Sequence, residues 1–392
     1  MIYLISTILL LLPTYLIRFS IFSIPTTLLE ILIYLVFIYG LYKAIKSGFR
    51  RLPLSGYLPI IVLILALIIS TAIAPDRRIA LGEFKGFFID PILVGWLVFQ
   101  FVKKEDLPKL FWALIFSGTF VAIHTILLKI LGQITADGRV IGIFGYSPNY
   151  LSLFLAPIAT LLIAYGISLM VEKKYLLSAI CAILFTIFLS ALYFSGSRGG
   201  FLAVAAGIGV YFIVSFWGWI RQRISIQIIV AILIILAIYT VWTFFQPDFS
   251  VSPESGGRVA TSNNLRWEIW KTSLELGKNH PLLGVGLGNF QNAFADLTAN
   301  RPNYPEYITP QALTSHNIFF MFWLSTGILG LTAFIWLLVI FVKNTLKKIS
   351  DNSTKMILAV MATIVFYSLI ESSIWKNDLS VIFWVFWALS WL

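Results

Sequence analysis

The sequence is poor in cysteine and in charge, and each scarcity excludes a class of protein. Cys181 is the only cysteine, so no intrachain disulfide can form. Charged residues make up 11% of the 392 residues, whereas soluble domains contain about 25%. A soluble globular domain is therefore excluded. Hydrophobic residues make up 59% of the chain and the mean hydropathy is +0.92, which identifies an integral membrane protein.

The net charge of +11 raises the alternative of a nucleic-acid-binding protein. The cations do not form one basic patch but stand in short clusters between apolar segments. Membrane topology explains this pattern better, because lysine and arginine accumulate in cytoplasmic loops. We therefore expect contact with membrane lipid and no nucleic-acid partner.

Apolar stretches long enough to cross about 30 Å of hydrocarbon predict an all-α polytopic membrane protein with about 12 transmembrane helices. The first stretch has no basic residue before Arg18, so we interpret it as a spanning helix and not as a cleaved signal. The predicted spans are 2–17, 25–45, 56–74, 83–102, 109–131, 148–170, 175–194, 200–219, 224–245, 316–342, 355–373 and 378–392.

The loop charges predict the orientation, with both termini in the cytoplasm. Alternate loops are rich in cations, and the intervening loops hold few. The cation-rich loops carry Lys43, Lys46, Arg50, Arg51, Lys103, Lys104, Lys109, Lys173, Lys174, Arg221, Arg223, Lys343, Lys347, Lys348 and Lys355. The opposite loops carry Arg18, Arg77, Arg78, Arg139, Arg198 and Lys376.

Residues 246–315 form one long outward loop, so we divide the chain into helices one to nine (1–245), this loop, and helices ten to twelve (316–392). Within the loop, "NNLRWEIWKTSLELG" (263–277) predicts an amphipathic helix. We expect its Trp267 and Trp270 at the membrane interface. The glycines of the following "HPLLGVGLGNF" permit a close approach of the backbone.

Several titratable residues are predicted on this outward face. His316 stands in "TSHNIFFMFWLSTGILG" (314–330), where a polar segment gives way to the tenth helix. Arg198 lies between glycines in "SGSRGG" (195–200), Arg139 precedes the sixth helix, and Arg266 is on the amphipathic helix. An arginine at a helix end is commonly only an interfacial anchor, but ionisable groups at the membrane boundary are candidates for function.

These segments resemble the O-antigen ligase family of membrane glycosyltransferases. The ligase signature is matched by His316, Asn317, nine residues, Gly327, two residues and Gly330. "SGSRGG" resembles the family's arginine motif, and "LRWEIWKTSLELGKNHPLLGVGLGNF" resembles its outward loop. "RVIGIFGYSPNYLSLFL" (139–155) is similar to the family's segment at the sixth helix.

The resemblance implies a GT-C-like fold and transfer of a glycan from undecaprenyl diphosphate to a sugar of the lipid A–core acceptor on the periplasmic face of the bacterial inner membrane. The family's catalytic histidine falls on His316. Its diphosphate-binding arginines fall on Arg198 and Arg266, with Arg139 and Lys85 as second-tier candidates. We expect Asn317 to orient the imidazole or to cap the helix.

Elementary chemistry agrees with these roles. Guanidinium groups offer paired donors to phosphate oxygens, and a neutral imidazole can take the proton of an attacking hydroxyl in an inverting displacement. Glu306 is a competing candidate for the base, whereas Glu371 and Lys376 are expected only to pair with each other. No Asp-x-Asp pair stands in a short outward loop, so we expect a metal-independent site and no cofactor.

Two other functions stay open. A polysaccharide polymerase or a protein oligosaccharyltransferase would use the same fold and donor with a different acceptor. A transporter of lipid-linked glycans is the alternative that is not an enzyme. Repeated halves and coupling acids, which a transporter is expected to have, are not found in the sequence.

The predicted orientation can be tested by labelling introduced cysteines. Ser255 lies in the long outward loop and Ser353 in a cytoplasmic one. A membrane-impermeant thiol reagent added to intact cells should label a cysteine at position 255 and leave one at position 353 unlabelled. Labelling at position 353 in intact cells would contradict the orientation.

Overall fold

The computed structural model describes residues 1–22, 24–135, 138–144, 148–216, 250–251, 258–259, 262–299 and 314–392. Regular structure in these ranges is helical apart from two antiparallel hairpins, β1 (Arg18–Ile21) with β2 (Ile24–Thr27) and β3 (Ser250–Val251) with β4 (Arg258–Val259). The helices are α1 (Ile2–Leu10), α2 (Leu28–Ser47), α3 (Leu54–Ile73), α4 (Arg77–Glu83), α5 (Asp90–Phe101), α6 (Leu107–Ile130), α7 (Pro148–Val171), α8 (Tyr175–Ser195), α9 (Arg198–Ser215), α12 (Ser262–Asn279), α13 (Phe290–Thr298), α14 (Ile318–Lys347), α15 (Asn352–Ser368) and α16 (Asn377–Leu389). Short 3-10 turns occupy Leu12–Leu16, Lys104–Asp106 and Gly142–Phe144, and a π-helical segment occupies Phe84–Ile89.

Within the described residues, eight helical segments are long and apolar enough to cross a membrane, which makes the chain an all-α polytopic membrane protein. These segments are Leu28–Ser47, Leu54–Ile73, Arg77–Phe101, Lys104–Ile130, Pro148–Val171, Tyr175–Ser195, Arg198–Ser215 and Ile318–Lys347. They coincide with the second to the eighth and the tenth of the predicted spans. The ninth predicted span, 224–245, lies outside the described residues.

The remaining predicted spans are shorter than expected, so a total of twelve stays a prediction. The predicted span 2–17 is broken: α1 ends at Leu10 and a 3-10 turn follows. Pro13 in that turn has no N–H to continue the helix. The last two spans correspond to α15, with 17 residues, and α16, with 13 residues.

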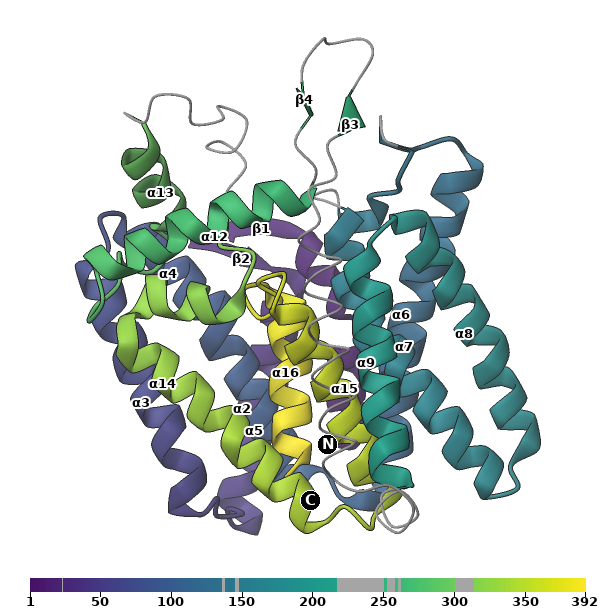
Figure 1. Cartoon of the computed structure of the whole chain (residues 1–392). Helices are drawn as coiled ribbons and strands as arrows, with labels where there is room; N and C mark the ends of the chain where they lie inside the picture. The colour runs from purple at the N-terminus through teal and green to yellow at the C-terminus, as the bar shows by residue number, and fades with distance from the viewer. Residues whose placement is uncertain are drawn as a thin grey trace.

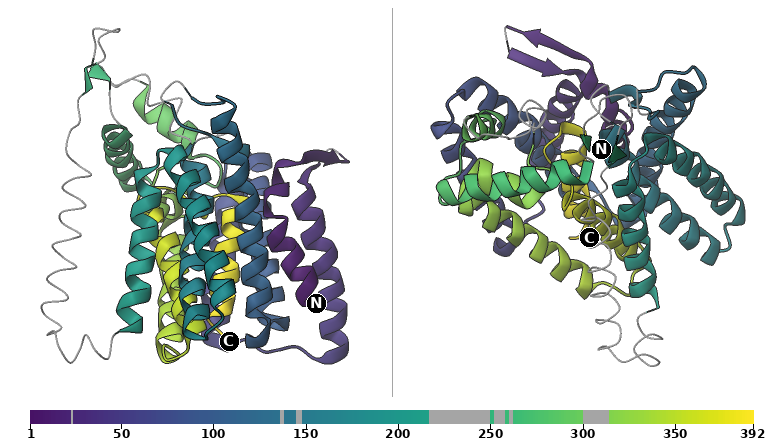
Figure 2. Two further views of the ribbon diagram at one scale, coloured as in Figure 1. Left: turned by 90° about the vertical axis from the view of Figure 1, so that its right-hand side faces the viewer. Right: turned by 45° about the horizontal axis from the view of Figure 1, so that its top comes forward.

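The helices form one bundle, in whose right-hand half in Figure 1 lies α7, a helix with almost all of its side chains buried. α7 packs against α6, α8, α9 and α15, while α14 packs against α3 and α16 against α5. The amphipathic helix α12 lies across one end of this bundle and contacts α14 (Figures 1 and 2). Both termini lie toward the opposite end. This arrangement gathers the predicted outward segments at one end of the molecule.

Aromatic packing supports the centre of this end. The rings of Phe322 and Phe334, both in α14, stack with centroids 4.2 Å apart. Trp375, in the turn between α15 and α16, meets Phe322 at 5.0 Å and Phe88 at 5.1 Å, both edge to face. Offset and edge-to-face ring pairs are favoured by the ring quadrupole. The cluster therefore holds the α15–α16 turn firmly against α14 and the π-helical segment.

α14 is broken at Gly327, where the backbone turns to φ 68° and ψ −170°. Only glycine adopts this region without strain. The break frees backbone groups, and the loop after α12 binds them: Val285 N–H donates to the Leu324 carbonyl at 2.7 Å, and Ile328 N–H donates to the Leu282 carbonyl at 3.2 Å. The outer segment of α14 thus takes its direction from this loop. The close backbone approach predicted for the loop is confirmed.

Replacing Gly327 with alanine should destabilise the protein. The methyl group would meet the Leu282 carbonyl, and the backbone strain alone costs about 1–3 kcal/mol. We expect a lower melting temperature in detergent, followed by tryptophan fluorescence. Gly209→Ala is the control: this α9 position has open space around it and should be neutral or slightly stabilising. Equal melting of Gly327→Ala and wild type would contradict this account of the break.

Candidate active site

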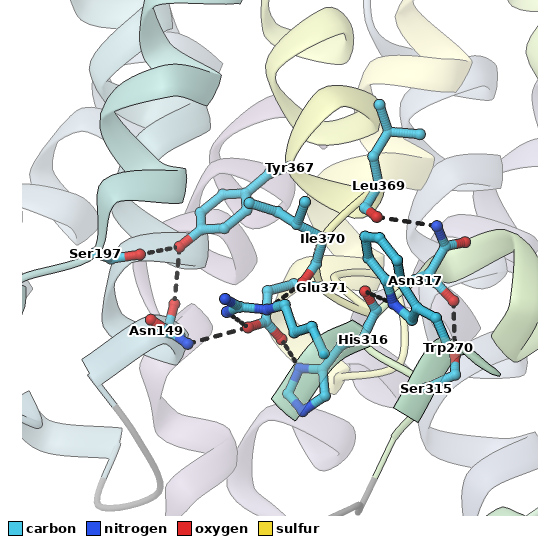
Figure 3. Close-up of polar contacts among 11 residues, drawn as sticks. Asn149, Ser197, Trp270, Ser315, His316, Asn317, Tyr367, Leu369, Ile370 and Glu371 are labelled. Atoms are coloured by element: carbon cyan, nitrogen blue, oxygen red, sulfur yellow. Dashed lines mark hydrogen bonds and ion pairs between the residues drawn. The ribbon is translucent and has the colours of Figure 1, made fainter. Parts of the chain in front are cut away.

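The polar centre of this end is the carboxylate of Glu371, in the turn between α15 and α16 (Figure 3). Glu371 is 6% exposed. Its Oε1 accepts from Arg266 at 2.8 Å and from the side-chain amide of Asn149 at 3.0 Å, and its Oε2 lies 2.8 Å from Nδ1 of His316. One carboxylate thus joins α12, the start of α7 and the residue preceding the α14 cap.

His316 is held by backbone geometry as well as by this contact. Its φ of 49° is in the left-handed region, which is uncommon for residues other than glycine and concentrates at functional sites. Trp270 Nε1 donates to the His316 carbonyl at 3.3 Å. Asn317 caps α14, because its side-chain oxygen accepts from the N–H groups of Phe319 at 2.9 Å and Phe320 at 3.2 Å. The capping role predicted for Asn317 is confirmed.

The ionisation state of Glu371 determines which ring nitrogen of His316 carries a proton. Burial alone would raise the pKa of Glu371, but the charges and hydrogen bonds of His316 and Arg266 hold this pKa well below its usual range. An ionised carboxylate can only accept hydrogen bonds. We therefore assign a proton to Nδ1 of His316, so that Nε2 is the nitrogen that can accept a proton when the ring is neutral. Among the residues that the structure describes, none hydrogen-bonds to Nε2, and the side chain is 26% exposed.

Arg266 is on the inner face of α12. Besides its bond to Glu371, its Nε donates to the Ile370 carbonyl at 3.2 Å. The predicted helix over 263–277 is confirmed, with ends at Ser262 and Asn279. Trp267 is 45% exposed, and Lys271 lies over its ring at 5.3 Å. The indole of Trp270 points toward His316, to whose backbone carbonyl it donates, and the interfacial position of Trp267 and Trp270 stays a prediction.

The segments that carry Arg198 and Arg139 lie against each other beside this cluster. Arg198 is the first residue of α9 and is exposed. Gly196, just before it, has a φ of 62°, and a side chain there would strike the aliphatic stem of Arg139. Ser197 Oγ lies 2.7 Å from the Tyr367 hydroxyl at the end of α15. The structure therefore brings the two arginine segments to the turn that carries Glu371.

Lys85 belongs to a neighbouring cluster. It lies in the π-helical segment, where its ammonium group pairs with Glu30 at 2.8 Å and donates to the Pro25 carbonyl at 3.0 Å. The segment reaches the Glu371 turn through Glu83, which accepts from Trp375 Nε1 at 3.0 Å. Lys85 thus connects the π-helical segment to β2 and α2, and a phosphate-binding role for it stays a prediction.

Sequence reasoning missed the role of Glu371. The expected pairing with Lys376 is wrong, because the carboxylate bonds to His316, Arg266 and Asn149 while the Lys376 ammonium lies 4.2 Å from the centre of the Tyr150 ring. The available signal was an acid at the membrane boundary inside "FYSLIESSIW". Glu306, the competing candidate base, lies outside the described residues.

In the described part of the chain, no three His, Cys, Asp or Glu side chains come together in a way that could hold a metal ion. Arg266 supplies a positive charge at the site. Metal independence itself stays a prediction.

Comparison with known proteins agrees with the motifs. Residues 181–335 match a family model described as O-antigen ligase. The O-antigen ligase of Salmonella typhimurium strain LT2 is 21% identical over 374 residues, which cover 90% of this chain and 87% of the relative. The matched family segment contains Arg198, Arg266, His316 and both signature glycines.

The fold and the site together define a multi-pass membrane protein with a hydrogen-bonded glutamate–histidine pair at one end of its bundle. Residues 181–335 are similar to the O-antigen ligase family, in agreement with the resemblance that the motifs carry.

Proposed function

We propose that this protein is an O-antigen ligase-type glycosyltransferase. It transfers a glycan from undecaprenyl diphosphate to a sugar hydroxyl of the lipid A–core acceptor. The reaction takes place on the periplasmic side of the inner membrane in a GT-C-like fold of about 12 helices, with both termini in the cytoplasm. The observation that carries this proposal is the glutamate–histidine pair beside arginines on the end of the bundle that bears α12.

His316 is the general base in this proposal. The acceptor hydroxyl gives its proton to Nε2, its oxygen forms the new bond to the anomeric carbon, and the bond from that carbon to the diphosphate oxygen breaks. The electron pair leaves on undecaprenyl diphosphate, and the displacement inverts the anomeric centre. Glu371 supports this role because it accepts from Nδ1 and stabilises the imidazolium that forms, as carboxylates do in catalytic triads.

Arginines stabilise the leaving diphosphate. Negative charge on the diphosphate grows as the glycosidic bond breaks, and guanidinium groups stay charged in partly desolvated sites. Arg198 is exposed at the start of α9, and the stem of Arg139 lies against Gly196, two residues before Arg198. Arg266 connects this side of the site to Glu371. The three side chains supply the positive charge that a metal ion provides in other transferases.

Replacement of His316 by alanine should nearly abolish transfer while the protein stays folded in the membrane. General-base assistance contributes roughly 10²–10⁴-fold, and His316→Gln should fail as well, because an amide cannot take the proton. The assay uses purified protein, a glycan on undecaprenyl diphosphate and lipid A–core, with EDTA expected to have no effect. His280→Ala, an exposed histidine outside the site, is the control. Near-normal transfer by His316→Ala would remove this residue from catalysis.

Arg198→Lys keeps the charge but loses the planar pair of donors, so we expect a large loss of transfer in the same assay. Arg77→Lys is a matched control, because Arg77 is likewise an exposed arginine at the first position of a helix. It should behave as wild type. Equal activity of the two variants would show that the guanidinium geometry at Arg198 plays no part in diphosphate binding.

A further inference from the structure

Ser197 is the N-cap residue of α9, but its side chain does not cap the helix. A serine at this position usually accepts a hydrogen bond from an N–H group of the first turn. The Ser197 side chain makes no such bond. Its Oγ lies instead 2.7 Å from the hydroxyl of Tyr367, which is 170 residues further along the chain (Figure 3). The start of α9 is therefore tied to the end of α15 by a hydroxyl that the local helix would otherwise use.

The ring of Tyr367 also contacts the first turn of α9. A Cβ atom on Gly199 would lie 3.1 Å from Cε2 of this ring and 2.5 Å from the Ile370 side chain. Only a glycine lets the α9 backbone come this close. Ser197 and Gly199 are the two neighbours of Arg198 in the chain. Tyr367 thus contacts the residues on both sides of this arginine, and it is itself only 2% exposed.

The Tyr367 hydroxyl stands between the two halves of the site. On its other side it lies 3.5 Å from the backbone carbonyl of Asn149, whose side-chain amide bonds to Glu371. A hydroxyl carries one donor and two acceptor lone pairs, so Tyr367 can donate to this carbonyl and accept from Ser197. One buried hydroxyl therefore connects the segment of Arg198 with the residue that supports the Glu371 carboxylate.

We propose that Tyr367 is a positioning residue for the donor: its bond to Ser197 fixes the start of α9, so that Arg198 meets the donor diphosphate at a set distance from the Glu371–His316 pair. Tyr367 does not touch the donor itself. A displacement of about 1 Å caused far from the chemistry can lower a rate roughly 100-fold. This inference rests on the proposed function and adds the residue that fixes its diphosphate-binding arginine.

A purely structural role for the bond makes a different prediction. If Tyr367 only stabilised the bundle, its hydroxyl would contribute to the melting temperature and leave donor binding unchanged. In Tyr367→Phe, however, the released Ser197 hydroxyl can turn to the free N–H groups of α9 and cap the helix. We therefore expect the melting temperature of Tyr367→Phe to stay close to that of the wild type while its use of the donor is impaired.

The test measures the two Michaelis constants separately, with purified protein, a glycan on undecaprenyl diphosphate and lipid A–core. Tyr367→Phe should raise the KM for the donor about fivefold, the effect expected from the loss of one hydrogen bond, and leave the KM for the acceptor unchanged. Ser197→Ala should have the same effect. The double variant should be no worse than either single variant, because both remove the same bond. Tyr211→Phe is the control: Tyr211 is a buried tyrosine in the second half of α9.

The same measurement in the Arg198→Lys background shows whether Tyr367 acts through the arginine. Here Tyr367→Phe should raise the donor KM no further. Effects of Tyr367→Phe and Arg198→Lys that multiply would overturn the inference, and so would a donor KM of Tyr367→Phe equal to that of the wild type. A failure of the proposed function is distinguishable, because it would appear as an unchanged donor KM in Arg198→Lys alone.

Discussion

The carboxylate of Glu371 is the constraint on which the geometry of this end of the molecule depends. It is 6% exposed and ionised, and such a charge is tolerated only when paired and hydrogen-bonded. Its partners come from α12, from the start of α7 and from the residue before the cap of α14. Each of these segments must therefore bring a side chain to the same point. Loss of Arg266 would leave the buried Glu371 carboxylate without its cationic partner, and breaking a buried ion pair in this way costs about 3–5 kcal/mol.

Apolar packing makes this polar arrangement rigid. Trp375, four residues after Glu371, is held between Phe88 and Phe322. On the opposite side, Gly196 lets the α8–α9 turn approach the stem of Arg139. Buried rings from three elements thus hold the turn that carries the carboxylate. The arginine segments approach this turn at the ends of their helices. A membrane protein can build such a site only at a boundary, because polar side chains within the hydrocarbon are costly.

The ligase signature has a physical meaning in this structure. Asn317 begins α14 by capping its first free N–H groups, and Gly327 ends the outer segment by allowing the break. The nine residues between them form a helical segment about 13 Å long. The loop after α12 binds the broken backbone, while α12 itself supplies Arg266 and Trp270 to the cluster. The spacing of the motif therefore sets the distance between the histidine and the point where the loop is docked.

Composition and periodicity alone determined the membrane class, most of the long helices and the amphipathic helix α12, because these depend on local patterns of apolar and polar residues. The motifs also marked His316, Arg198 and Arg266. The pairing of Glu371 was decided only by the tertiary structure. Glu371 is 55 residues from His316 and 105 from Arg266, and the nearby Lys376 offered a simpler partner. The orientation of Trp270 could not be predicted for the same reason, because its indole donates to the backbone carbonyl of His316, 46 residues further along the chain. Local sequence specifies which residues can ionise or cap a helix, but only packing of distant segments decides which of them share a buried charge.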